Sequence, residues 1–119
     1  MAVTARTLRT SPVIRVKPVR RWFRLSQEAF AKALGVGRAT VARWEAADAG
    51  PNANTAEGRL LTAMIEARDL AVKMFGPWQA KAWFDDVAPT FNETPRATLV
   101  KRGPIPVRDL LMEGSEGSY

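Results

Sequence analysis

The sequence of 119 residues contains no cysteine and no histidine. The lack of cysteine excludes disulfides and thiolate metal sites, and it is typical of proteins in a reducing compartment. The lack of histidine removes the commonest general base and a principal zinc ligand, which excludes Ser-His-Asp and Cys-His catalysis. No apolar run approaches the length of about 18 residues that a membrane-spanning helix needs. We therefore expect a cytoplasmic protein that has no metal, no cofactor and no membrane span.

Carboxylates alone give little basis for catalysis. Asp85 and Asp86 are the best candidates for a catalytic pair, and they are adjacent in the sequence. Neighbouring side chains do not face each other on a helix, so these two groups cannot act from opposite sides of one bond. We therefore predict that the chain is not an enzyme.

Positive charge is concentrated near the N-terminus. The net charge is +6, and residues 1–24 hold seven basic side chains and no acidic one. Such an excess at one end is typical of a surface that binds a polyanion, although a solvated tail that only aids solubility would have the same composition. Residues 1–17 show no helical or strand periodicity and contain Thr, Ser, Pro and Arg, which predicts a flexible basic arm.

Beyond the arm, apolar residues recur at helical spacing and no convincing strand is present. A first helix is expected to begin at Pro18, because proline suits the first helical position. A second helix follows Ser26 as N-cap and ends at Gly35. A third helix runs from about Arg38 and is expected to end near Gly50.

The second half of the chain predicts three more helices, over residues 54–75, 78–84 and 107–112. Asn54 and Glu57 have the spacing of a capping box at the start of the first of these, and Gly76-Pro77 breaks it. The expected fold is all-α, with an arm over 1–17, a first domain over 18–75 and a C-terminal region over 76–119.

Residues 27–46 meet the demands of two short helices that cross closely around a tight turn. A small residue, Ala31, lies where the helices touch, and Gly35 can adopt the positive φ that the turn requires. The positions that must join the pair to a core are all apolar: Phe30, Leu34, Val36, Val41 and Trp44. The alternative is an ordinary helical hairpin in an unrelated bundle. Such a hairpin does not require the small residue, the glycine and all five apolar residues at these positions. We therefore predict a helix-turn-helix.

The stretch LSQEAFAKALGVGRATVARWE resembles the helix-turn-helix of the Xre family, the phage-repressor-like group. The resemblance implies that the second helix enters the major groove of double-stranded operator DNA and that Gln27 contacts a phosphate. The sequence departs from the family at Gly37, where a Ser or Thr cap is usual, and glycine there costs only a few tenths of a kcal/mol. It departs again at Ala47, where glycine is usual, which suggests that the third helix continues to Gly50.

The resemblance places four residues against base edges: Arg38, Ala39, Ala42 and Arg43. Arginine suits a bidentate bond to guanine, and alanine can only touch a thymine methyl or permit close approach. Both arginines can instead contact phosphates. The phosphate candidates are Gln27, Thr40, Arg20, Arg21 and Arg24. The basic arm either follows a minor groove or acts as a salt-sensitive phosphate tether. A homodimer is expected, because one helix reads too few base pairs.

The stretch AWFDDVAPTFNETPRATLVKRGPIPVRDLLMEGSEGSY resembles the C-terminal toxin-binding domain of the Xre/MbcA/ParS antitoxins. The matching positions are Trp83-Phe84, Pro89, Phe91, Thr94-Pro95, Leu99, Gly103, Val107 and Leu110-Leu111. Arg96-Ala97 departs from the acidic-apolar pair that is common after the Thr-Pro. The resemblance implies a type II antitoxin that represses its own operon and neutralises a RES-type toxin, which consumes NAD⁺.

On the same resemblance, the toxin-binding residues are Trp83, Arg102, Ser115, Ser118 and Tyr119. Core packing is the alternative role for Trp83 and the other apolar residues of this half, and disorder is the alternative for the tail. Two other functions stay open for the whole chain: a plain transcriptional repressor whose C-terminal half only dimerises, and a structural protein that does not bind DNA. Bound to DNA, the protein would lie at the nucleoid.

Overall fold

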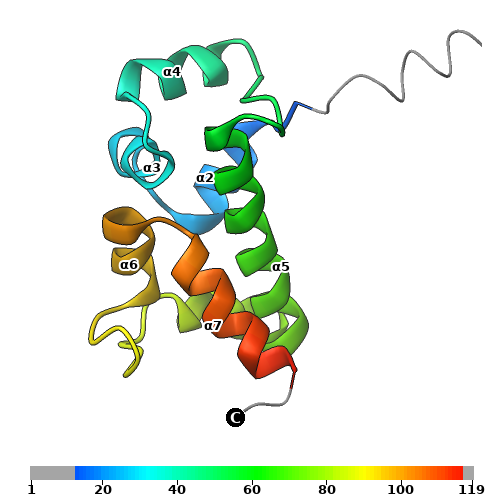
Figure 1. Ribbon diagram of the computed structural model, residues 1–119, viewed down its shortest axis with the longest axis vertical. Helices are drawn as coiled ribbons and strands as arrows, with labels where there is room; N and C mark the ends of the chain where they lie inside the picture. Colours follow the sequence, from blue (N-terminus) through cyan, green and yellow to red (C-terminus); the bar gives the residue numbers. More distant parts are fainter. Residues whose placement is uncertain (1–12, 117–119) are drawn as a thin grey trace, which may run out of the picture.

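In a computed structural model, residues 13–116 are described, and their regular structure is helical apart from two isolated β-bridges. The helices of this part of the chain are α2 (Val16–Phe23), α3 (Gln27–Leu34), α4 (Arg38–Ala46), α5 (Ala56–Trp83), α6 (Pro95–Arg102) and α7 (Ile105–Ser115). This confirms the all-α prediction. Figure 1 shows α4 across one end of the molecule, α5 along its length, and α7 ending at the opposite end. The predictions for residues 1–12, Ser118 and Tyr119 lie outside the described residues.

Helix α2 begins two residues earlier than the sequence predicts. Val16, Val19 and Phe23 lie on one face and are buried, as the helical spacing of apolar residues requires. Pro18 is the third residue of the helix, where its missing N–H costs nothing because the first turn has no internal acceptors. Arg24 ends the helix in a left-handed conformation (φ 56°).

Helix α4 ends at Ala46, so the prediction that it continues to Gly50 was wrong. Asp48 has a left-handed conformation (φ 53°), and this turns the chain out of the helix. The following residues pair with the segment before α2: Val16 N–H donates to Ala49 O at 3.2 Å, and Ile14 N–H donates to Pro51 O at 3.4 Å. At the helix end itself, Ala49 N–H donates to Trp44 O at 2.7 Å and Asp48 N–H donates to Glu45 O at 3.1 Å. A local C-cap therefore ends the helix, and the pairing with residues 14–16 fixes the chain that follows it.

Residues 13–17, which the sequence assigned to the flexible arm, are part of the fold. Val13 forms a β-bridge with Asn52, and Val16 is fully buried. The two segments approach so closely that a Cβ on Gly50 would lie 1.6 Å from Ile14 O. Glycine is required at position 50 for this reason, and the chain before α2 is held firmly beside the loop after α4.

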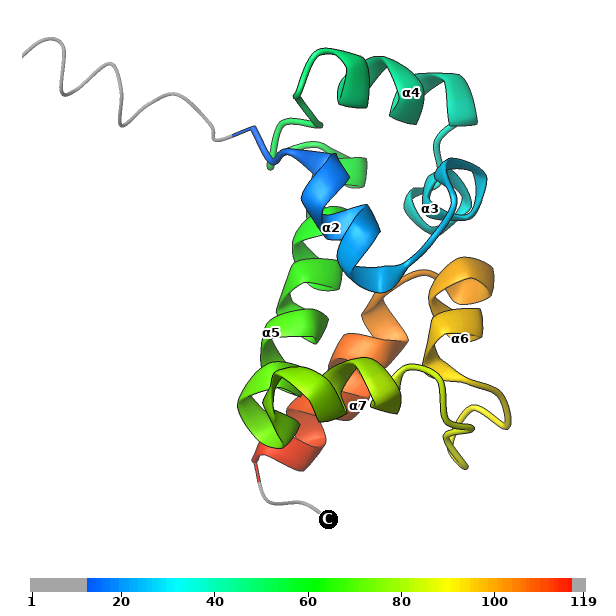
Figure 2. The same cartoon turned by 180° about the vertical axis from the view of Figure 1, so that it is seen from behind.

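Helix α5 consists of two segments that meet at Gly76, whose φ of 86° is not helical. This confirms the predicted break, and Figure 2 shows the second segment turning away from the first. At the start of α5 the predicted cap is wrong by one residue. Thr55, rather than Asn54, is the N-cap, and its hydroxyl accepts a hydrogen bond from Gly58 N–H at 3.0 Å.

Helix α6 was missed, because it lies between the helices predicted over 78–84 and 107–112. Thr94 is its N-cap and accepts from Ala97 N–H at 3.1 Å, while Pro95 occupies the first turn. The last helix, α7, is longer than the predicted 107–112 and extends from Ile105 to Ser115.

The C-terminal helices pack onto the N-terminal ones and share one core with them. Phe84 is fully buried and meets Trp22, Phe23 and Trp83 edge-on, with ring centroids 4.9–5.8 Å apart. The Arg96 side chain donates to Phe23 O at 2.9 Å, and α6 lies beside α3 (Figure 1). The two halves of the chain are therefore joined by an aromatic cluster and by polar contacts.

The shared core predicts that Phe84→Leu destabilises both halves together. The loss of ring contacts leaves a partly filled space and should cost about 1–2 kcal/mol of unfolding free energy. Urea unfolding followed by far-UV circular dichroism and by tryptophan fluorescence should give one coincident transition, shifted to lower urea. Val87→Ala, at an exposed position, is the control and should shift it little. Two separate transitions, of which only one moves, would contradict the shared core.

Candidate nucleic-acid interface

Helices α3 and α4 cross in close contact, as the sequence predicts. Ala31 is buried at the crossing, and Gly35 makes the turn with φ 72°. Val36 N–H donates to Ala31 O at 3.0 Å, which closes the turn. Phe30, Leu34 and Val41 are fully buried or nearly so, and Val36 and Trp44 pack against the core. The helix-turn-helix geometry therefore rests on the residues that predicted it.

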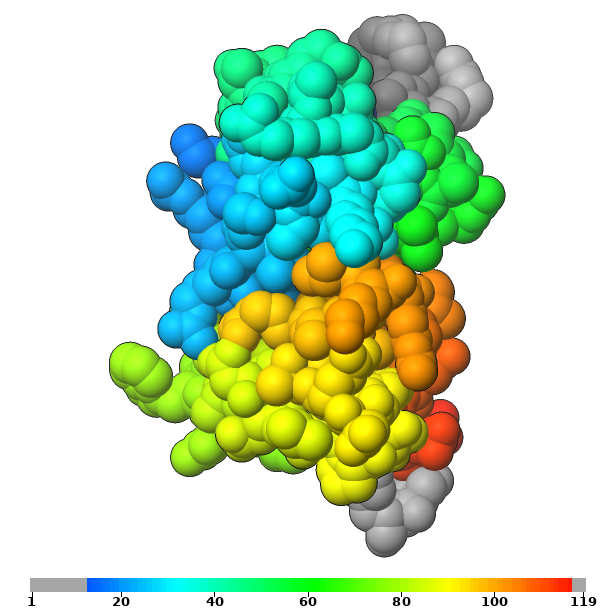
Figure 3. All heavy atoms as spheres, turned by 90° about the vertical axis from the view of Figure 1, so that its left-hand side faces the viewer, coloured from blue at the N-terminus to red at the C-terminus, as the bar shows by residue number. Residues whose placement is uncertain are grey.

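Helix α4 presents one face to the exterior. Arg38, Ala39 and Arg43 are exposed and Ala42 is half-buried, and at 100° per residue the four positions span an arc of about 140°. Among residues 13–116, neither the Arg38 nor the Arg43 guanidinium has a hydrogen-bond or ion-pair partner. In Figure 3, α4 forms a ridge at the end of the molecule. The predicted base-contacting side chains are thus exposed, and both guanidinium groups are available.

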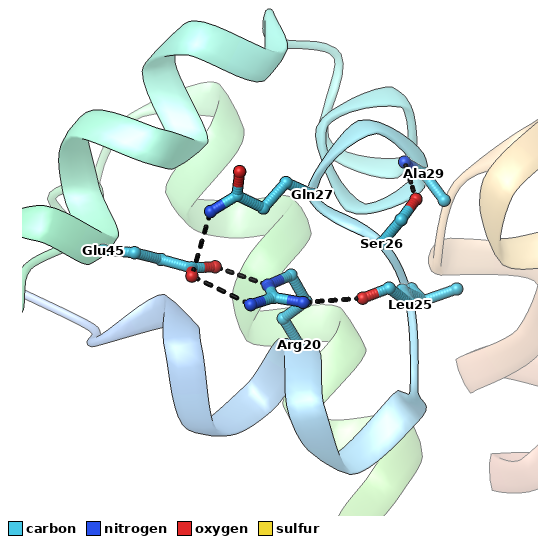
Figure 4. Close-up of polar contacts among 6 residues, drawn as sticks. All are labelled: Arg20, Leu25, Ser26, Gln27, Ala29 and Glu45. Atoms are coloured by element: carbon cyan, nitrogen blue, oxygen red, sulfur yellow. Dashed lines mark hydrogen bonds and ion pairs between the residues drawn. The ribbon is translucent and has the colours of Figure 1, made fainter.

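The inner side of α4 is fixed by Glu45, which receives hydrogen bonds from two other helices (Figure 4). Arg20 in α2 donates from Nε to Oε2 at 2.5 Å and from Nη2 to Oε1 at 2.9 Å. Its Nη1 donates to Leu25 O at 2.9 Å. Gln27, the first residue of α3, donates from Nε2 to Oε1 at 3.2 Å. One carboxylate therefore connects α2, α3 and α4.

The Arg20–Glu45 ion pair is largely shielded from solvent, with 18% of the arginine side chain and 7% of the glutamate side chain exposed. The hydrogen bonds from Arg20 lower the pKa of Glu45. Burial raises this pKa, and the hydrogen bond from Gln27 lowers it further. The same contact raises the pKa of Arg20. Both groups are therefore charged at neutral pH, and the pair gains strength from its two-pronged geometry.

Comparison with known proteins agrees with this geometry. A family model described as Helix-turn-helix matches residues 19–57, less than half of the chain. Residues 19–57 form a helix-turn-helix domain of the Xre type. The match supports a DNA-binding transcription regulator. No curated protein matches the sequence significantly.

Two of the predicted phosphate contacts of the helix-turn-helix domain have other partners. Arg20 uses three of its five N–H donors within the protein, so we assign it to holding α2 against α4. Arg24 caps the end of α2 that points away from α4 (Figure 2), where it pairs with Asp85 at 2.6 Å. Asp85 also pairs with Arg96. Arg24 therefore belongs to the junction with the C-terminal half, which no local pattern in the sequence indicates.

The phosphate contacts predicted for Arg20 and Arg24 remain predictions, as do those of the other candidates. Arg21 is exposed and its guanidinium has no partner within residues 13–116. The side-chain amide of Gln27 has two N–H donors, and it donates one of them to Glu45. Thr40 is half-buried in the first turn of α4. Glu45 itself was not among the predicted site residues, because its importance depends on partners 18 and 25 positions away.

The three predicted toxin-binding residues that lie within residues 13–116 are on different elements of the fold. Trp83 is half-buried against Phe75, with ring centroids 6.1 Å apart, and it lines a cavity of about 310 Å³ with Val87 and Leu110 among others. Arg102 is the last residue of α6, whereas Ser115 is the last residue of α7, and the Ser115 hydroxyl donates to Met112 O. Trp83 thus has a packing role and also borders an open cavity.

Two further properties of residues 13–116 bear on the site. None of their helices is long and apolar enough to cross a membrane. No group of three or more Asp, Glu, His or Cys side chains among them is placed to hold a metal ion.

The shielded ion pair predicts a pH-dependent effect of Glu45→Gln. The variant leaves Arg20 without its counter-charge and should lower the unfolding free energy by about 2–3 kcal/mol at pH 7. Because the folded-state pKa of Glu45 is lowered, its contribution is full above the unfolded-state pKa and is lost as the pH falls through the folded-state value.

Urea unfolding at several pH values checks this prediction. The difference between the wild type and Glu45→Gln should be constant near neutrality and should shrink in acid. Glu113→Gln, at an exposed position of α7, is the control and should change stability by less than about 0.5 kcal/mol. A Glu45→Gln variant as stable as the wild type at pH 7 would contradict the role of the pair.

Proposed function

We propose that this protein is a transcriptional repressor that binds operator DNA by inserting α4 into the major groove. The observation that carries the proposal is the pair of exposed, unpartnered guanidinium groups of Arg38 and Arg43, on a helix that Glu45 holds to the rest of the domain. Guanidinium groups read guanine in the major groove by bidentate hydrogen bonds. Nothing in the proposal requires catalysis, and we propose no enzymatic activity.

The dimensions of α4 suit this role. A helix of nine residues is about 13 Å long, and the major groove is about 12 Å wide. One copy can read only a few base pairs, so we propose that the protein binds as a homodimer to two half-sites. The exposed alanines allow α4 to approach the bases closely, and the arginines then supply the direct contacts.

Arg43→Ala is expected to weaken operator binding by about 1–3 kcal/mol and to relax the preference at one base position in each half-site. The duplex to use contains the region directly upstream of this protein's own coding sequence, with fluorescence anisotropy as the measurement. Lys73→Ala is the matched control, because it also removes one exposed positive charge but lies near the end of the first segment of α5. Equal affinities and equal base preferences of Arg43→Ala and the wild type would refute the assignment.

We propose further that the C-terminal half makes the protein an antitoxin that neutralises a RES-type toxin encoded beside it. The resemblance of residues 82–119 to antitoxins of this kind supports the proposal. So does the placement of α7, whose end lies at the opposite end of the molecule from α4 (Figure 1), since a partner there leaves α4 free for DNA. Trp78 is 87% exposed on the second segment of α5, whereas tryptophan is highly buried on average in folded proteins.

A chain that ends at Glu116 tests this proposal without disturbing any described contact. It should bind operator DNA as the full chain does, and it should fail to protect cells from the co-expressed product of the adjacent gene. Its mass in complex with that product, compared with that of the full chain, gives an independent measurement. Full protection by the shortened chain would refute a role of the tail. An intact dimer with no second protein would favour the alternative, a repressor whose C-terminal half only dimerises.

A further inference from the structure

Three basic side chains converge at the N-terminal end of α2. Arg15, Lys17 and Arg21 line a cavity of about 260 Å³ together with Pro18 and Asp48. Asp48 is the one acidic residue of this lining, and it accepts a hydrogen bond from Arg15 Nε at 3.0 Å. Both side chains of the pair are mostly exposed, at 62% and 68%. We call Arg15, Lys17 and Arg21 the basic cluster.

The basic cluster is fixed to the C-terminal end of α4. Asp48 lies two residues after the end of that helix. The two backbone hydrogen bonds between residues 14–16 and 49–51 hold Arg15 beside the loop. Lys17 lies close enough to α4 to add to the effect of Arg20 in lowering the pKa of Glu45. In Figure 3, blue side chains of the segment around the start of α2 protrude on the flank just below α4.

The length of α4 indicates where the basic cluster would lie relative to the DNA backbone. Because α4 is about as long as the major groove is wide, the two phosphate backbones that border the groove lie near the two ends of the helix. Gln27 and Thr40, at the start of α4, are the predicted phosphate contacts at one end. The basic cluster is the positive surface at the other end.

We propose that the basic cluster binds a phosphate of the DNA backbone at the C-terminal end of α4, and that Asp48 competes with this phosphate for Arg15. The proposal rests on the DNA binding proposed above and adds a second backbone contact to it. An exposed ion pair contributes little to stability, so Arg15 can exchange its partner readily. The carboxylate, however, places a negative charge where the phosphate would lie, which weakens binding to DNA.

The conformation of Asp48 makes this role testable with one small change. Its φ of 53° is left-handed, and asparagine adopts this conformation at least as readily as aspartate. The turn after α4 therefore does not need the charge. Asp48→Asn removes the competitor and keeps the backbone and the size of the side chain.

Asp48→Asn should bind DNA more tightly than the wild type, by roughly three- to tenfold at moderate salt, and its plot of log affinity against log salt should be steeper by up to about one unit. Because phosphate contacts do not depend on sequence, the gain should appear on the upstream duplex and on a random duplex of equal length. Arg15→Ala should weaken binding to both, and Asp48→Asn should gain less in the Arg15→Ala background.

Asp109→Asn is the matched control, because Asp109 is also an exposed partner of an arginine, Arg108, but lies on α7. It should leave both affinities unchanged, and urea unfolding should show that all variants are folded. Specific binding by the wild type with no gain in Asp48→Asn overturns this inference and leaves the proposed function standing. An equal gain in Asp109→Asn also overturns it, since the effect would then be one of net charge. A wild type that binds neither duplex overturns both proposals.

Discussion

The ion pair between Arg20 and Glu45 is the contact on which the presentation of α4 depends. Helix α4 buries one residue fully, Val41, and packs the partly buried Trp44 against the core. The ion pair adds a directional contact to this apolar packing. The carboxylate of Glu45 binds the guanidinium of α2 through two hydrogen bonds and also accepts from the first residue of α3. A shielded charge that lost its partner would be costly, and the orientation of α4 relative to α2 and α3 is fixed by this requirement.

The arginine side chains differ in whether they have an ion-pair partner. Arginines that face the protein interior or the junction are paired: Arg20 with Glu45, and Arg24 and Arg96 with Asp85. Arg38 and Arg43, on the outer face of α4, have no partner within the described residues. Arg15 is intermediate, because its pair with Asp48 is open to solvent. For these six arginines, the pairing separates those that hold the fold together from those that are available to a polyanion.

Local signals explain which parts of the fold could be predicted. Ser26, Ala31 and Gly35 act on their own neighbours, so the sequence alone predicts the helix-turn-helix and its turn. The end of α4 is a local C-cap at Asp48, whose left-handed conformation is less common than that of glycine. The pairing of residues 49–51 with 14–16 lies far apart in the sequence, and no local pattern indicates it. Helix α6 also has a local signal, since Thr94-Pro95 is a good cap followed by a good first residue, although no helix is predicted there. The roles of Arg20 and Arg24 depend on partners 25 and 61 positions away.

The central claim is that α4, held by Glu45, reads the major groove. Methylation of guanine N7, which lies in that groove, tests it most directly on the duplex upstream of the coding sequence. The account predicts protection of guanines in two half-sites about 10 base pairs apart. Unchanged reactivity of every guanine N7 under saturating protein, or protection confined to adenine N3 in the minor groove, would contradict it.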